Sequence, residues 1–165
     1  MPSPQKTLIS VLATSLATTA NAAHLRAVWT TGSFQTTPGP GGNGESGHFT
    51  GFTILNDKNE AIFNSKTPGE KSPCFSTKGG REFTMGDDPC WHQDRKFQCK
   101  SNLAGNTEGC EVKDQDGNSL GTGEGKTDTT FIGIAIGQDS TCVVEFNTDD
   151  DEDCGANSGL KVKSG

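Results

Sequence analysis

The sequence is short of the residues that build a large apolar core. It contains no tyrosine and only two methionines. Leu, Ile, Val and Phe together make up about one in six residues, which is below the ~20% level at which chains become difficult to fold by burial alone. After residue 22 no apolar run approaches the roughly 20 residues that a membrane-spanning helix needs. A marginal core and no membrane anchor are therefore expected.

Positive charge is also in short supply. The chain has 14 Lys and Arg against 21 Asp and Glu, so its net charge is −7. Nucleic acids and anionic membranes attract proteins through clustered positive charge. The balance therefore argues against a nucleic-acid partner, and it is consistent with a surface that keeps the protein in solution.

No stretch of ten residues keeps a helical apolar period, and glycine (22 residues), proline, asparagine and aspartate interrupt the chain about every ten residues. This pattern is typical of short strands joined by turns. We therefore predict an all-β fold, a small disulfide-stabilised antiparallel sandwich or barrel.

Three hairpins are predicted. The first has strands at 49–55 and 60–63 around a turn at 56–59. The second has strands at 110–113 and 119–121 around a turn at 114–118. The third has strands at 130–136 and 141–146 around a turn at 137–140. The third hairpin is the most apolar, so we expect it to form the core and to hold the first hairpin by packing. Shorter strands are expected around 27–34, 82–85 and 96–99, with an edge strand near Leu160 and Val162. A flexible Gly/Pro loop is expected at 38–47 and an acidic loop at 148–158.

The amino terminus has the pattern of a secretory signal peptide. Lys6 precedes an apolar run over 8–20, and Ala20-Asn21-Ala22 places small residues three positions and one position before a cleavage point. Cleavage after Ala22 predicts a signal peptide at 1–22 and a single secreted, extracellular β domain at 23–165. Cleavage after Ala23 is the alternative.

Six cysteines follow the signal segment, an even number in a chain bound for an oxidising compartment. They are Cys74, Cys90, Cys99, Cys110, Cys142 and Cys154. No C-x-x-C pair is present, so the spacing does not suit a structural zinc site. We expect three disulfides, each adding about 3 kcal/mol of stability by restricting the unfolded chain. The sequence leaves their pairing open.

Three motifs resemble catalytic or binding signatures but fail on context. Residues 117–121 read G-x-S-x-G, yet no helical segment follows and His92 is the last histidine, so no downstream base is available. Residues 121–127 fall one residue short of a phosphate-binding loop. The run that starts at Asp114 lacks the sixth-position glycine and twelfth-position glutamate of an EF-hand. No catalytic residue and no cofactor are expected.

Two weaker possibilities for metal binding remain. The acidic run Asp149, Asp150, Asp151, Glu152 and Asp153 is a weak calcium candidate, although such runs are usually solvated. Cleavage after Ala23 would leave His24 at the amino terminus, where it could bind copper with His48 or His92, but no tyrosine is available as an axial ligand.

Trp91 and His92 could contact a glycan or partner, whereas packing of Trp91 over a cystine is the common alternative.

An Ala/Thr-rich signal segment followed by a Gly-rich, acidic β domain with six cysteines resembles the small secreted cysteine-rich proteins of filamentous fungi. Many of those are effector candidates. The resemblance covers the whole chain as a format and implies action outside the cell by binding to a host or a competitor. We therefore expect a secreted, non-catalytic interaction protein that recognises a protein or a cell-wall glycan. A secreted carbohydrate-active enzyme or a glycan-binding module is the alternative.

Overall fold

A computed structural model of the chain describes residues 23–36, 46–68, 81–86, 91–132, 135–148 and 159–164. The predicted signal peptide, most of the Gly/Pro loop and most of the acidic loop lie outside these ranges. The strands are β1 (Ala23–Thr36), β2 (Ser46–Leu55), β3 (Ala61–Ser65), β4 (Arg81–Gly86), β5 (Arg95–Ser101), β6 (Thr107–Lys113), β7 (Ser119–Ile132), β8 (Ala135–Thr148) and β9 (Lys161–Ser164). The described ranges contain no helix that could cross a membrane.

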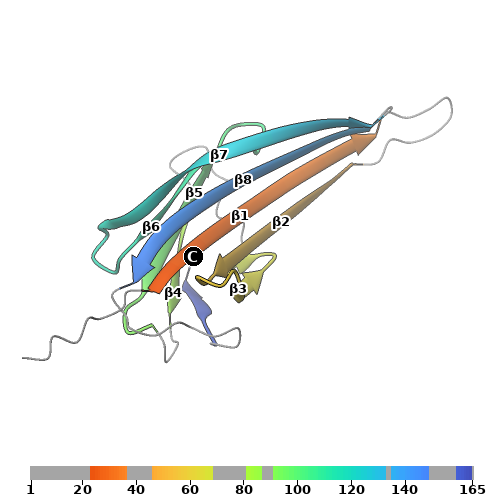
Figure 1. Cartoon of the computed structure of the whole chain (residues 1–165). Helices are drawn as coiled ribbons and strands as arrows, with labels where there is room; N and C mark the ends of the chain where they lie inside the picture. Colours follow the sequence, from red (N-terminus) through yellow and green to blue (C-terminus); the bar gives the residue numbers. More distant parts are fainter. Residues whose placement is uncertain are drawn as a thin grey trace, which may run out of the picture.

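The strands form one antiparallel sheet in the order β3-β2-β1-β8-β7-β6-β5-β4-β9. The sheet curls into a nearly closed, barrel-like shape. In Figure 1, β1, β2, β7 and β8 continue beyond the ends of β4–β6 toward the upper right. We call this extension the arm; it comprises residues 30–36 of β1, 46–51 of β2, 126–132 of β7 and 135–141 of β8. The predicted all-β fold is confirmed.

The core fills the inside of the curled sheet. Side chains alternate between the two faces of a strand, and on β1 this places Leu25, Ala27 and Trp29 inside, each at most 1% exposed. The Phe52 ring of β2 lies 4.9 Å from the Phe83 ring of β4 and 4.6 Å from the Phe97 ring of β5. These strands are far apart in the sheet order, so their aromatic contacts hold the two ends of the sheet together across the interior.

β7 changes partner halfway along its length. Its first half pairs with β6 up to the pair Gly109 and Glu124, and its second half pairs with β8 from Gly125 onward. The inward positions at this change are glycines. A Cβ at Gly121 or Gly123 would overlap a backbone carbonyl of β8, and one at Gly125 would overlap the carbonyl of Thr107. Glycine therefore lets β8 and β6 cross β7 in direct backbone contact. The run at 121–127 that resembled a phosphate loop thus serves this close crossing of strands.

The first two predicted hairpins are confirmed as β2–β3 and β6–β7, and the strands expected at 27–34, 82–85, 96–99 and the carboxyl-terminal edge correspond to β1, β4, β5 and β9. The third hairpin was predicted with the wrong turn. Gly137–Ser140 lies inside β8, where Ser140 pairs with both Thr127 and Thr31. The residues have turn-like composition, but strands on both sides keep them extended. β7 ends at Ile132 and β8 begins at Ala135, and residues 133–134 lie outside the described residues.

The structure corrects three further expectations, which concern the core, the first hairpin and the two loops. Within the described residues the buried core draws on β1–β6, on the 142–146 part of β8 and on Trp91 and Leu160, so it is not confined to the third hairpin. The β2–β3 hairpin is held by the long ladder between β2 and β1. Ser46 and Gly47, expected in the flexible loop, begin β2, and Thr148, expected in the acidic loop, ends β8.

The disulfide expectation is met in part within the described residues. Cys110 of β6 is bonded to Cys142 of β8, which ties together the two strands that flank the glycine run of β7. Cys99 is disulfide-bonded as well. Cys74, Cys90 and Cys154 lie outside the described residues. The Cys110–Cys142 bond closes a loop with a sequence separation of 32 and so restricts a large part of the unfolded chain.

Gly123→Ala should destabilise the fold by about 2–3 kcal/mol, because its methyl group would overlap the Val143 carbonyl and press on the Cys142 sulfur. Urea unfolding measures the change. Gly51→Ala is the matched control, since a Cβ at Gly51 meets nothing within 4 Å. Equal unfolding midpoints for the two variants would contradict the close crossing of β7 and β8.

Replacing Cys110 and Cys142 together by alanine should lower the free energy of unfolding by about 3–4 kcal/mol, the loop-closure contribution for a separation of 32. Urea unfolding without reductant measures this loss. An unchanged midpoint would show that the bond does not restrain the unfolded chain.

Candidate functional site

The residues predicted to contact a partner occupy different environments. Trp91 is 5% exposed, and its ring lies edge-on to Phe146 at 6.4 Å, so it belongs to the core. His92, the next residue, is exposed. A glycan contact by Trp91 would require the indole to leave the core, whereas His92 lies on the surface. The contact itself remains a prediction.

The predicted metal ligands are not brought together in the described part of the chain. There, no three His, Cys, Asp or Glu side chains lie close enough to hold a metal ion. The His24 ring is hydrogen-bonded to Asn147 at 2.9 Å. His48 pairs with Ser33, which is about 30 Å along β1 from His24 at ~3.3 Å per residue. The two histidines therefore cannot share one copper ion. The acidic run 149–153 lies outside the described residues.

The interior of the curled sheet offers little space for a ligand. The void bounded by Phe52, Trp91, Phe97 and Phe146 measures about 10 Å³, which is at the limit for a single water molecule. Small-molecule sites are usually hundreds of cubic ångströms in volume. This void is therefore too small for an organic ligand.

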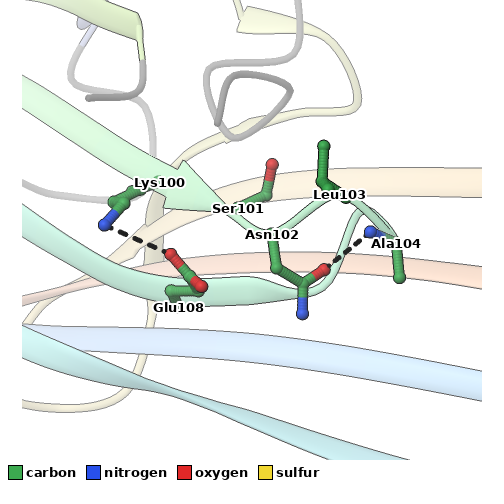
Figure 2. Close-up of a pocket in the computed structure, with 6 residues that line it drawn as sticks. All are labelled: Lys100, Ser101, Asn102, Leu103, Ala104 and Glu108. Carbon is green, nitrogen blue, oxygen red and sulfur yellow. Dashed lines mark hydrogen bonds and ion pairs between the residues drawn. The ribbon is translucent and has the colours of Figure 1, made fainter. Parts of the chain in front are cut away.

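The surface feature that stands out is the turn between β5 and β6 (Figure 2). Leu103 at its tip is 95% exposed, and Val143, at 42%, is the other exposed large apolar side chain among those whose burial the structure describes. The turn borders an open depression of about 560 Å³ lined by Lys100, Ser101, Asn102, Leu103, Ala104 and Glu108. An exposed leucine thus lies beside a hollow flanked by one positive and one negative charge.

Asn102 organises this turn. Its side-chain oxygen accepts hydrogen bonds from the amides of Ala104 at 2.9 Å and Asn106 at 3.0 Å. Its backbone carbonyl accepts from the amide of Gly105, whose φ of 86° favours glycine. The local backbone is therefore held by asparagine and glycine, and Leu103 and Ala104 at the tip are not needed for it.

The same turn occurs in two other hairpins. In β2–β3, Asn56 accepts from the Lys58 and Glu60 amides, and Asn59 has the positive φ. In β6–β7, Asp114 accepts from the Asn118 amide, and Gly117 has the positive φ. The position of Leu103 is taken there by polar residues, Asp57 and Gln115. Three equivalent turns therefore differ in the side chain that they expose.

The base of the β5–β6 turn is anchored to the arm. The Thr107 amide donates to the Ser140 hydroxyl at 2.8 Å, and the Thr127 hydroxyl donates to the same oxygen at 3.1 Å. Lys100 and Glu108 form an ion pair across the hairpin at 3.3 Å. Such exposed pairs contribute little stability, so the buried Thr107–Ser140 bond is the stronger restraint on the position of Leu103.

Sequence reasoning missed this turn because it expected only an isolated short strand around 96–99 and did not pair that strand with the one that begins at Cys110. A usable signal was present. Asn102 precedes Gly105 by three residues, the same spacing as Asp114 and Gly117 in the hairpin that was predicted correctly. A search for that spacing would have found the turn and its leucine.

The β6–β7 turn, in which Asp114 takes the place of asparagine, is sensitive to acid. Hydrogen bonds to Asp114, above all from the Asn118 side chain at 2.7 Å and then from nearby backbone amides, lower the pKa of its carboxyl below the usual 3.8. The folded state therefore favours the carboxylate. This stabilisation is complete above the unfolded-state pKa and is lost as the pH falls through the lower folded-state pKa.

Asn118→Ala should raise the pKa of Asp114 toward 3.8, because it removes the largest of these hydrogen bonds. NMR titration of the side-chain carboxyl measures the pKa in both proteins. Asp114→Asn should keep the turn, as asparagine does at 56 and 102, and should remove this contribution to acid sensitivity. The same pKa in the wild type and in Asn118→Ala would contradict the assigned cause.

Comparison with known proteins adds no relative: no protein-family model, curated protein or solved structure matches this chain.

Proposed function

We propose that this protein is a secreted, non-catalytic interaction protein that recognises a protein or a cell-wall glycan, in the manner of a fungal effector. The β5–β6 turn is the proposed contact. The observation that carries the proposal is Leu103, which is 95% exposed on a turn whose geometry does not require it.

The physical argument concerns what an exposed, well-positioned apolar side chain can contribute. A single exposed leucine is ordinary on a protein surface. Leu103 differs because its backbone is fixed by Asn102 and the turn is anchored through Thr107, so little conformational freedom is lost when a partner covers it. The adjacent Lys100 and Glu108 supply a polar rim. An apolar centre with a polar rim is the usual anatomy of a protein interface.

Two further observations favour binding at the surface. The interior void of about 10 Å³ is too small for an organic ligand. Disulfide-bonded Cys99, Cys110 and Cys142 suit an oxidising compartment, which is where a secreted protein acts. Secretion and the fungal resemblance enter the proposal from the sequence.

Leu103→Gln tests the contact, because glutamine occupies the equivalent position in the β6–β7 turn and should leave the fold intact. The immobilised wild type and variant would be exposed to a glycan array and to proteins of host extracellular fluid, with capture measured by quantitative mass spectrometry. We expect affinity for the captured partner to fall about tenfold or more, the loss typical of a central apolar contact.

Gln115→Leu is the control. It creates an exposed leucine on an equivalent turn at another place and should not change the affinity for that partner. Equal binding by the wild type and Leu103→Gln would rule out the turn as the contact. Release of soluble sugar from wall polysaccharides by the purified protein would instead support a carbohydrate-active enzyme.

A further inference from the structure

Both ends of the sheet carry the features by which natural proteins prevent edge pairing. β3 has five residues and its ladder with β2 shifts register between Ile54 and Leu55. β9 has four residues and its ladder with β4 shifts between Thr84 and Met85. Short and irregular edge strands are poor templates for another strand. Neither end of the sheet is therefore suited to pair with a second protein.

The half of β7 that lies in the arm, residues 126–132, is neither short nor irregular. β6 leaves the edge of β7 after the pair Gly109 and Glu124, because Thr107 crosses to the inner side of Gly125 and bonds to Ser140. From Lys126 to Ile132, no strand among the described residues pairs with that edge of β7. On its other side β7 follows β8 without a register shift as far as Ile132 and Ala135. The result is a long, regular edge.

The residues of this edge suit strand pairing. Residues 126–132 read Lys-Thr-Asp-Thr-Thr-Phe-Ile, with four β-branched residues, one aromatic residue and no glycine or proline. One lysine and one aspartate make the segment neutral in a chain of net charge −7. Two copies can therefore bring this edge together without the repulsion that the rest of the acidic surface would impose.

We propose that β7 pairs with β7 of a second copy of this chain, antiparallel, about a two-fold axis at Thr129. This interaction is separate from the partner contact at Leu103. It joins the two arms into one continuous eight-stranded sheet ordered β2-β1-β8-β7 and then the same strands in reverse. The barrel-like bodies lie at opposite ends of this sheet.

The register follows from length and charge. An axis at Thr129 pairs Lys126 with the partner's Ile132, Thr127 with the partner's Phe131, and Asp128 with the partner's Thr130. The whole free edge is used, no like charges face each other, and one pair joins an aromatic residue to a β-branched residue, a favourable combination.

Neighbouring registers fail. An axis at Asp128 would place the two aspartates opposite each other, and like charges in that position are destabilising. An axis at Thr127 would bring the partner's Thr130 against Glu124, a place already occupied by Gly109 of β6. An axis at Thr130 would leave Lys126 and Thr127 unpaired.

Charge substitutions at the axis test this arrangement. Thr129 is exposed in the single chain, so Thr129→Asp and Thr129→Lys should leave the fold intact, as checked by circular dichroism. In the dimer each substitution would face its own copy. We expect the purified wild type to have twice the mass of one copy by light scattering. Each variant alone should dissociate with a Kd raised about fivefold or more, and an equimolar mixture should recover the wild-type Kd as a heterodimer.

Thr122→Asp and Thr122→Lys are the controls, because Thr122 is an exposed threonine on the half of β7 that β6 already covers. They should not change the mass. A monomeric wild type at its highest soluble concentration would overturn the proposal. So would a dimer that Thr129→Asp and Thr129→Lys do not weaken, or a mixture that fails to recover it.

Discussion

The direct backbone contact between β8 and the glycines of β7 determines the shape of this molecule. Because no side chain projects from Gly121 or Gly123 toward the Glu145 and Val143 carbonyls, β7 can leave β8 and continue with β6. One strand thereby serves both the barrel-like body and the arm. The disulfide from Cys110 to Cys142 lies at the same crossing, so covalent and steric restraints act on one place.

The barrel-like body and the arm differ in what they bury and in what they expose. The body buries the few large apolar residues around Phe52 and leaves almost no space inside. The two proposed interactions therefore use the outside of the molecule, namely side chains presented by turns and backbone groups presented by the arm. The three equivalent turns are suited to this, because their geometry depends on asparagine, aspartate and glycine and leaves the tip residues free to vary.

Local chemistry was predictable from the sequence, and long-range pairing was not. The turns at 56–59 and 114–118 were predicted because an Asx side chain and a positive-φ residue act within five positions. Gly137–Ser140 was misread because its extended form depends on β1, which lies about a hundred residues earlier. The glycines at 121–125 looked like a ligand loop because the strands that contact them, β6 and β8, lie about 20 residues away on either side and their crossing cannot be read from the local pattern. Leu103 was missed because its turn lies in a region of low strand propensity.

The two tryptophans have a practical consequence for studying this protein. Trp29 is fully buried opposite Cys142, Trp91 is buried against Phe146, and the chain contains no tyrosine. Ultraviolet excitation above the phenylalanine band is therefore absorbed mainly by two indoles that both report on the core. One lies on β1 and the other in the segment before β5. The native molecule thus contains its own pair of optical reporters, and no label is needed to follow the packing around them.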